Sequence, residues 1–157
     1  MAAGLLFREG QLLIAQRPAQ AHLGGLWEFP GGKRHAGETF QQCLARELRE
    51  ELGIEVEVGD VFERVTHDYP EKTVHLEFFL CRLVRGEPRA LGCPAFAWVK
   101  ARELDHYEFP AADARLLERL KNAPGLWSLS SPITPTGSTA SARREARETA
   151  AGFEAGV

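Results

Sequence analysis

The stretch of residues 32–54, GKRHAGETFQQCLARELREELGI, constrains the fold of this chain most. Its second half carries an apolar residue at every fourth position from Phe40 to Leu52, which is the stripe of an amphipathic helix. Thr39 with Gln42 matches a capping box, and Gly53 can close a helix in the left-handed conformation. We therefore predict a helix over residues 40–52.

Three glutamates of this helix, Glu47, Glu50 and Glu51, are spaced so that they share one side, next to the apolar stripe. They lie in the last turns, where the helix dipole disfavours each carboxylate by about 0.3–1 kcal/mol, so they require a compensating cation. Arg46 and Arg49 would supply it if this side is a solvated face of ion pairs. Alternatively, the three carboxylates bind a hard divalent ion such as Mg²⁺ or Mn²⁺, which prefers oxygen ligands.

The segment before the helix begins with strands and ends in a loop. Apolar-rich runs at residues 2–7 and 11–16, joined by a short polar link, predict a β-hairpin. Residues 17–37 follow neither the strand nor the helix period, and we expect a long loop there. A loop of that length in a compact domain is usually functional.

Beyond the helix, the pattern predicts strands and then a second helix. β-Branched or alternating runs at residues 56–65, 73–84 and 96–99 are typical of strands. Leucines at helical spacing predict a helix over residues 111–122. The residues alone thus indicate a mixed α/β fold.

Length and composition indicate one domain with one core. We place it at residues 1–125, and we interpret residues 126–157, which begin with a Ser-, Thr- and Pro-rich run, as a flexible linker and a charged tail. A net charge of −3 gives no basic field for a nucleic acid polymer, and no apolar run approaches the roughly 20 residues that a membrane helix needs. The first ten residues lack the basic region of a secretory signal.

Three cysteines lie far apart in the sequence with no CxxC spacing. Cys43, Cys81 and Cys93 cannot all pair, which favours a reducing compartment and a cytoplasmic location. We interpret them as small buried hydrophobic residues.

The spacing of the fixed positions within residues 32–54 is specific. The glycine at its start is followed after five residues by Glu38, after seven more by Arg46-Glu47-Leu48, and then by Glu50-Glu51 and Gly53-Ile54 with one residue between each group. This pattern resembles the Nudix box at every defined position. Further similarity to the MutT-type Nudix hydrolases covers residues 2–120. It includes Arg17, the WEFPGG run, Tyr69-Pro70, Trp98-Val99 and Phe109-Pro110.

The resemblance implies an α/β/α sandwich with a mixed β-sheet, and a Mg²⁺-dependent hydrolase. Such an enzyme cleaves a nucleoside triphosphate into a monophosphate and pyrophosphate, here 8-oxo-dGTP or a normal or modified cytidine triphosphate. That activity would serve nucleotide-pool sanitation. We expect a monomer or weak homodimer acting on a small nucleotide, without a nucleic acid polymer or membrane as partner.

By the same resemblance, the metal ligands are Glu47, Glu50, Glu51 and the main-chain carbonyl of Gly31. Glu47 or Glu50 would orient and deprotonate the attacking water, and Arg46 would hold the glutamates in place. We expect Glu38 to shape the loop and the start of the helix rather than bind the first metal ion.

The residues expected to contact substrate are the following: Arg17, His22, Glu28, Phe29, Pro30, Gly31, Lys72 and Asp113. Arg17 and Lys72 occupy phosphate-facing positions of the family, although for each residue taken alone an ordinary surface charge is favoured. Phe29 and Trp27 either border the base or belong to the core. His22 either faces the ligand or makes a structural hydrogen bond.

Two positions depart from the family pattern. Many relatives have a glutamate six residues before the tryptophan of the last strand, where this chain has Gly92, and Glu87 is the nearest acidic substitute. The 8-oxoguanine-selective relatives have asparagine where this chain has Asp113. An ionised carboxylate only accepts hydrogen bonds, so Asp113 favours a base edge with donors, such as the amine of cytosine or adenine. Alternatively, Asp113 caps the last helix.

Two other functions remain open at this point. Nudix-like domains also include catalytically silent modules that bind nucleotides, although those generally lose glutamates of the box. Hydrolysis of a nucleotide sugar such as ADP-ribose is the third possibility.

Overall fold

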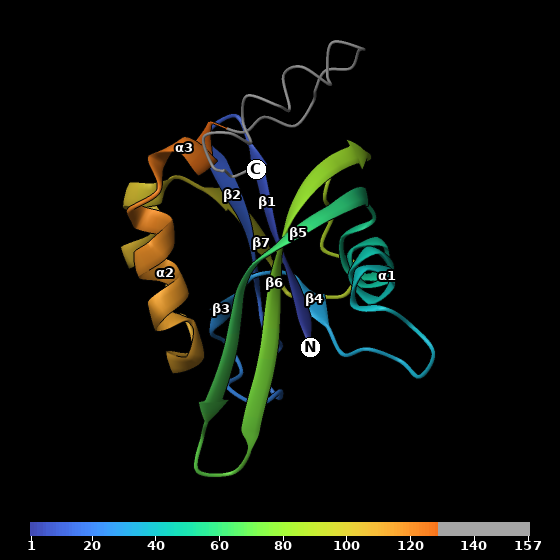
Figure 1. Ribbon diagram of the computed structural model, residues 1–157, viewed down its shortest axis with the longest axis vertical. Helices are drawn as coiled ribbons and strands as arrows, with labels where there is room; N and C mark the ends of the chain where they lie inside the picture. Colours follow the sequence, from blue (N-terminus) through green and yellow to red (C-terminus); the bar gives the residue numbers. More distant parts are fainter. Residues whose placement is uncertain (129–157) are drawn as a thin grey trace.

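The computed structural model of the chain describes residues 1–128, and the segment expected to form the linker and charged tail lies outside them apart from its first three residues. A seven-stranded mixed sheet forms its centre (Figure 1). The strands are β1 (Ala2–Arg8), β2 (Gln11–Gln16), β3 (Trp27–Glu28), β4 (Gly31–Gly32), β5 (Glu55–Asp68), β6 (Thr73–Arg85) and β7 (Phe96–Val99). No helix within residues 1–128 is long and apolar enough to cross a bilayer.

The sheet is mixed because β1 pairs with β6 in parallel, whereas all its other pairs are antiparallel. The main path runs β3-β2-β1-β6-β5, with β4 paired to β1 and β7 paired to β2. The first half of β1 therefore lies between β4 and β6. This places the start of β1 beside the glycines of β4, where the cavity described below opens.

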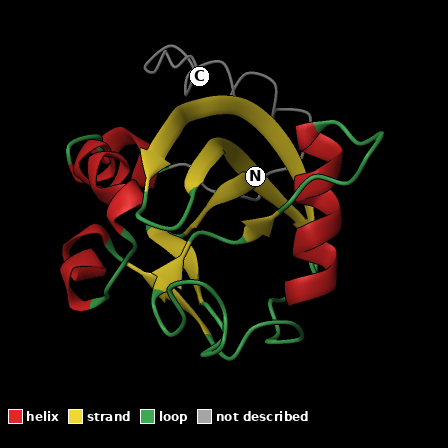
Figure 2. Ribbon diagram, turned by 90° about the horizontal axis from the view of Figure 1, so that it is seen from below, coloured by secondary structure: helices red, strands yellow, loops and turns green. Residues whose placement is uncertain are grey.

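Helices cover both faces of the sheet (Figure 2). The helix α1 (Phe40–Leu52) packs on one face, and α2 (Ala114–Lys121) and α3 (Pro124–Trp127) pack on the other. Alternate residues of β1 enter the two cores: Leu5 belongs to the α2 side and Leu6 to the α1 side. The expected α/β/α sandwich with a mixed sheet is confirmed.

The helix α1 begins and ends at the residues that the sequence predicts. Thr39 accepts from the backbone of Gln42 at 3.0 Å, and the Gln42 side chain accepts from the backbone of Thr39 at 2.9 Å, so both halves of the capping box are present. Gly53 closes the helix with a φ of 70°, a conformation in which a side chain would be strained. Cys43 lies on the buried side of α1, fully enclosed, as expected of a small hydrophobic residue.

Three departures of the structure from the sequence-based expectations concern the long loop, the last helix and the end of the domain. The loop over residues 17–37 contains two short strands, β3 and β4, which carry no hydrophobic alternation because each has only two residues. The last helix begins as a 3-10 turn, η2 (Ala111–Asp113), and becomes α-helical only in α2. A second 3-10 segment, η1 (Ala101–His106), connects β7 to this region.

The third departure concerns the end of the packed region. Residue 125 was the expected boundary, yet Leu126 and Trp127 are 9% and 8% exposed and belong to the core. The indole Nε1 of Trp127 donates to the carbonyl of Leu120 at 2.9 Å, and its ring meets the ring of Phe7 edge-on. The fold therefore extends past the predicted boundary.

Candidate active site

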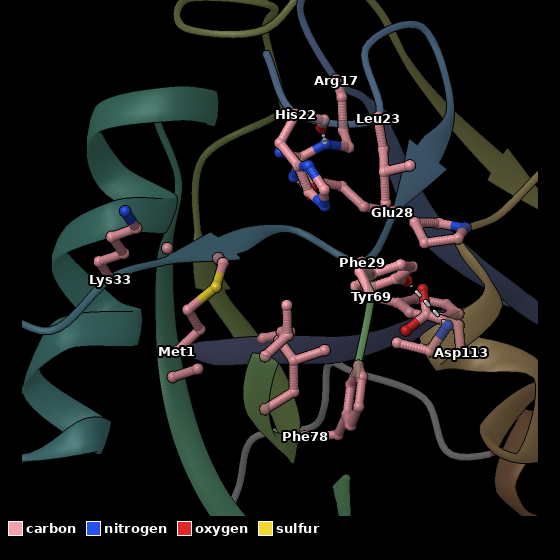
Figure 3. A pocket seen from close by; sticks show the side chains of 18 of the residues that line it. Met1, Arg17, His22, Leu23, Glu28, Phe29, Lys33, Tyr69, Phe78 and Asp113 are labelled. Carbon is pink, nitrogen blue, oxygen red and sulfur yellow. Dashed lines mark hydrogen bonds and ion pairs between the residues drawn. The ribbon is translucent and has the colours of Figure 1, made fainter. Parts of the chain in front are cut away.

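A cavity of about 350 Å³ opens between the start of β1, the loop after β2, the β5–β6 turn and the turn η2 (Figure 3). Seven of the eight residues expected to contact substrate line it, and Pro30 does not. Pro30 is buried, and its carbonyl accepts from the backbone of Gly4 at 2.8 Å. Pro30 therefore helps to hold β1 in place and does not line the cavity.

The glycines of β4 allow three elements to meet at one wall of this cavity. A Cβ at Gly31 would lie 1.9 Å from the carbonyl oxygen of Ala2, and a Cβ at Gly32 would lie 2.3 Å from Cδ of Glu47. Gly31 therefore cannot carry a side chain without separating β4 from β1, whereas a side chain at Gly32 would displace the Glu47 carboxyl group. The result is that the α1 glutamates approach the backbone of β4.

Two of the three expected metal-binding glutamates lie together. Glu51 lines the cavity, and the Glu47 carboxyl group lies close enough to affect its pKa. Burial, together with the nearby carboxylates of Glu47 and Glu28, raises the pKa of Glu51 to about 8. Glu50 points outward, with a side chain 58% exposed and bonded to Arg46 at 3.2 Å.

Arg46 connects this acidic group to the loop before α1. Its guanidinium bonds Glu38 at 2.6 Å, Glu47 at 3.1 Å and the carbonyl of Lys33 at 3.1 Å. The Glu38 carboxylate also accepts from the backbone of His35 at 2.8 Å, and these bonds lower the pKa of Glu38 to about 2, the bond from Arg46 contributing most. Glu38 thus shapes the loop, as expected.

The donor set at this end of the cavity fits a hard cation. It consists of carboxylate and carbonyl oxygens, and Glu51 forms no ion pair with any of residues 1–128, although its burial disfavours the unneutralised charge. A divalent ion would relieve both the burial and the repulsion from Glu47. Among residues 1–128, no three acidic, histidine or cysteine side chains are gathered for metal binding, and Glu50 is directed to Arg46 instead of the cavity.

Arg17 is held at the cavity by a half-buried ion pair. Its Nη1 donates to Glu28 at 2.6 Å, and its Nε donates to the carbonyl of His22 at 2.7 Å. Burial raises the pKa of Glu28, whereas the charge and hydrogen bond of Arg17 oppose that shift. Arg17 therefore lines the cavity and also forms a structural ion pair.

His22 contacts the β5–β6 turn on the opposite wall. Its Nδ1 lies 3.2 Å from the Glu71 carboxylate, and its ring meets that of Tyr69 edge-on at 5.3 Å. Its Nε2 is the one buried side-chain nitrogen or oxygen within residues 1–128 that has no hydrogen-bond partner. His22 thus makes the structural contact considered above while also lining the cavity.

Asp113 lines the far end of the cavity, away from Lys33 and α1 (Figure 3). It stands at the N-cap position of α2 but makes no side-chain capping bond. Its side chain is not engaged as a cap, so the capping interpretation is wrong. Burial, reinforced by the charge of Glu28, raises the pKa of Asp113 to about 7.

The aromatic residues of the WEFPGG run separate into two roles. Phe29 lines the cavity and is also 3% exposed, stacked on Phe109 at a centroid distance of 5.2 Å. Trp27 does not line the cavity and packs edge-on against Tyr107 at 5.0 Å. Of the two, only Phe29 is placed to border a ligand.

Comparison with known proteins decides the family. A family model for the NUDIX domain matches residues 2–119. The chain belongs to the Nudix family. The 8-oxo-dGTP diphosphatase of Haemophilus influenzae is 40% identical over 78% of this chain and 90% of that protein. The CTP pyrophosphohydrolase of Escherichia coli is 39% identical over 75% of this chain and 87% of that protein.

Solved structures of similar proteins share the architecture. The solution structure of the Escherichia coli ORF135 protein matches with a TM-score of 0.68 and 38% identity, covering 78% of this chain and 87% of that one. The crystal structure of the MutT protein from Methanosarcina mazei matches with a TM-score of 0.69 and 27% identity, covering 77% of this chain and 91% of that one. The MutT-type resemblance drawn from the sequence is confirmed.

Gly92, the departure from the Nudix pattern, packs directly on α1. Its backbone donates to the carbonyl of Glu51 at 3.0 Å, and a Cβ there would lie 3.2 Å from Cα of Glu51. Glu87 does not substitute for the missing glutamate, because it is exposed and pairs with Arg8 at the opposite end of β1.

Lys33 and Tyr69 are among the lining residues of this Nudix chain that the sequence did not mark as site residues. Lys33 follows β4 and lines the cavity, and the signal for it was its place directly after the paired glycines. Tyr69 entered the sequence comparison only as part of the Tyr69-Pro70 pair, yet its side chain lines the cavity. No periodicity in the sequence marks either of them.

Proposed function

We propose that this Nudix protein is a nucleoside triphosphate pyrophosphohydrolase. The observation that carries the proposal is that one cavity joins an acidic end, with Gly31 and Glu51, to a distant end with Phe29 and Asp113. A triphosphate needs cation-supported oxygen ligands at one end, and a base needs an aromatic wall and a few polar groups at the other. The names of the relatives, 8-oxo-dGTP diphosphatase and CTP pyrophosphohydrolase, support the same reaction class.

Mg²⁺ is the proposed cofactor, with Mn²⁺ as a substitute. Glu47, Glu50, Glu51 and the carbonyl of Gly31 would hold it, with Glu50 turning inward from Arg46. When bound, the ion neutralises charge on the phosphate oxygens. In this proposal Arg46 keeps Glu47 and Glu50 oriented, and either of these accepts the proton of the attacking water.

Two lysines are available for the phosphates. Lys33 and Lys72 line the cavity, and neither forms an ion pair with any of residues 1–128. A free ammonium group can form charge-assisted hydrogen bonds with phosphate oxygens at little cost. Arg17, held by Glu28, would contribute a fixed charge beside them.

The base is proposed to bind against Phe29 and Asp113, with Glu28 and His22 closing the same wall. An ionised Asp113 accepts a hydrogen bond from an exocyclic amine, which favours a cytidine triphosphate. A protonated Asp113 both donates and accepts, which suits 8-oxoguanine as well. Since the pKa of Asp113 is raised to about 7, both forms are populated near neutral pH.

A substrate panel tests the proposal. Purified protein with Mg²⁺ is given 8-oxo-dGTP, dCTP, modified dCTPs and ADP-ribose, and pyrophosphate and monophosphate are measured. We expect pyrophosphate from 8-oxo-dGTP or a cytidine triphosphate, and near-complete loss of activity in Glu50→Gln and Glu51→Gln. Full activity in the double variant contradicts the proposal.

Two other outcomes identify the alternatives. Tight nucleotide binding without turnover would indicate a binding module, and cleavage of ADP-ribose alone would indicate a nucleotide-sugar hydrolase. We further propose a monomer or weak homodimer in the cytoplasm, a location supported by the three free cysteines, Cys43, Cys81 and Cys93.

A further inference from the structure

Tyr69 occupies a rigid position in the turn that joins β5 to β6. Its backbone N–H donates to the carbonyl of Lys72 at 2.8 Å, and the N–H of Lys72 donates back to the carbonyl of Tyr69 at 3.2 Å. Its ring lies between two histidines, 5.3 Å from the ring of His22 and 4.6 Å from that of His67. The phenol group is thus held at a defined point of the cavity wall.

The hydroxyl of Tyr69 caps the turn η2 from a distant part of the chain. The backbone N–H of Ala112 donates to this hydroxyl at 2.9 Å. Ala112 lies in the first turn of a helical segment, where backbone N–H groups lack partners within the helix. Ala112 is 5% exposed, so without Tyr69 this N–H would be buried and unsatisfied.

The bond from Ala112 to Tyr69 bears on the placement of Asp113, the next residue along the chain. Asp113 directly follows Ala112 and makes no side-chain capping bond of its own. Its carboxyl group lines the cavity beside Tyr69 (Figure 3). The turn that carries Asp113 is therefore held to the β5–β6 turn by the bond between Tyr69 and Ala112.

We propose that Tyr69 is a positioning residue that sets base specificity, because its hydroxyl holds η2 so that the Asp113 carboxyl faces the base. This inference rests on the proposed function and names a second determinant of the same site. The Tyr69 oxygen accepts from Ala112, so its own hydrogen remains free. The bond from Ala112 is the one hydrogen bond of the Tyr69 hydroxyl within residues 1–128, so Tyr69 affects the base through the placement of Asp113.

The test is Tyr69→Phe, which keeps the ring and removes only the hydroxyl. We expect the ratio of kcat/KM for dCTP to that for 8-oxo-dGTP to fall by about 5- to 10-fold, because Asp113 no longer faces the base. One hydrogen bond accounts for a change of this size. The change should lie in KM, since no group that touches the phosphates is altered. Equal losses for both substrates, or an unchanged ratio, overturn the inference.

A matched control is Tyr107→Phe, which removes the other tyrosine hydroxyl of the chain. Tyr107 packs on Trp27 outside the cavity, and its hydroxyl makes no hydrogen bond within residues 1–128. We expect the ratio to be unchanged. In a double-mutant cycle, Tyr69→Phe should have no further effect on the ratio once Asp113→Asn is present, whereas additive effects overturn the positioning role.

Two readouts do not depend on activity. Metal-free calorimetric titration with dCMP and 8-oxo-dGMP should show the same change in relative affinity for Tyr69→Phe. In the wild-type protein, the amide of Ala112 should be protected from hydrogen exchange, and fast exchange there overturns the inference even if Tyr69→Phe fails to fold. If the wild-type protein cleaves no triphosphate, the proposed function fails. If it does and the ratio is unaffected, only the role of Tyr69 fails.

Discussion

The guanidinium of Arg46 donates to the Glu38 carboxylate at 2.6 Å and so ties the loop before α1 to the acidic end of the cavity. Because the same guanidinium orients Glu47, we expect Arg46→Met to weaken Mg²⁺ binding by about 10- to 100-fold, the usual effect of losing a residue that orients metal ligands. Titration of Mg²⁺ against thermal stability and against activity measures it. The control is Arg49→Met, since Arg49 is exposed on α1 and forms no ion pair with residues 1–128. Equal effects in both variants contradict the prediction.

Glu51 makes metal binding depend on pH. Its pKa is raised to about 8, so the metal-free folded state holds a proton that the unfolded state has released. The metal-free protein therefore loses stability as pH rises from 4.5, the ordinary pKa of a glutamate, to about 8, the pKa of Glu51 in the folded state. Mg²⁺ needs the ionised form, so the rise in Tm with Mg²⁺ should be larger at about pH 8.5 than at about pH 6.5.

Glu51→Gln should remove both effects. We expect this variant to be more stable than the wild-type protein without metal at high pH, and to show no Mg²⁺-dependent rise in Tm. Glu57→Gln, on the exposed side of β5, serves as the control. A Tm rise that is the same at both pH values would argue against a buried carboxylate as a ligand.

Asp113→Asn tests both base choice and the buried carboxyl group. If Asp113 reads the base, the amide should raise kcat/KM for 8-oxo-dGTP relative to dCTP, because an amide both donates and accepts.

The raised pKa of Asp113 also predicts that the wild-type protein loses stability between about pH 4 and about pH 7, where only the folded state keeps this proton. The difference in unfolding free energy between variant and wild type should therefore grow from low to neutral pH, as measured by urea denaturation. An unchanged difference contradicts the assignment of a buried carboxyl group.

Trp127 tests the extent of the folded domain. Trp127→Ala should lower the free energy of unfolding by about 3–5 kcal/mol, because it removes a buried aromatic side chain that packs on Phe7. Trp127→Phe, which keeps a ring but loses the bond to Leu120, should cost about 1 kcal/mol. Denaturant unfolding of both variants measures the difference. If Trp127→Ala leaves the free energy of unfolding nearly unchanged, the folded domain ends at residue 125 as first predicted.

The features that could be predicted from the sequence depend on short-range physics. The capping box at Thr39, the closing glycine at Gly53 and the stripe from Phe40 to Leu52 each involve neighbours within a few residues along the chain. The strand β7 likewise begins and ends at the predicted residues. The spacing of the glutamates in α1 identified the family, because it is a pattern along one helix.

Tertiary structure alone decided how the cavity is built. The convergence of Glu47 with Glu51, while Glu50 turns to solvent, depends on how α1 lies against β4. The bond from Ala112 to Tyr69 joins residues 43 positions apart, and it leaves Asp113 free to face the cavity instead of capping its helix. Local patterns carry no information about such contacts, because the partners meet only when separate elements pack. The chain alone therefore determined the helix α1, most of its strands and its family, and packing determined which side chains face the ligand.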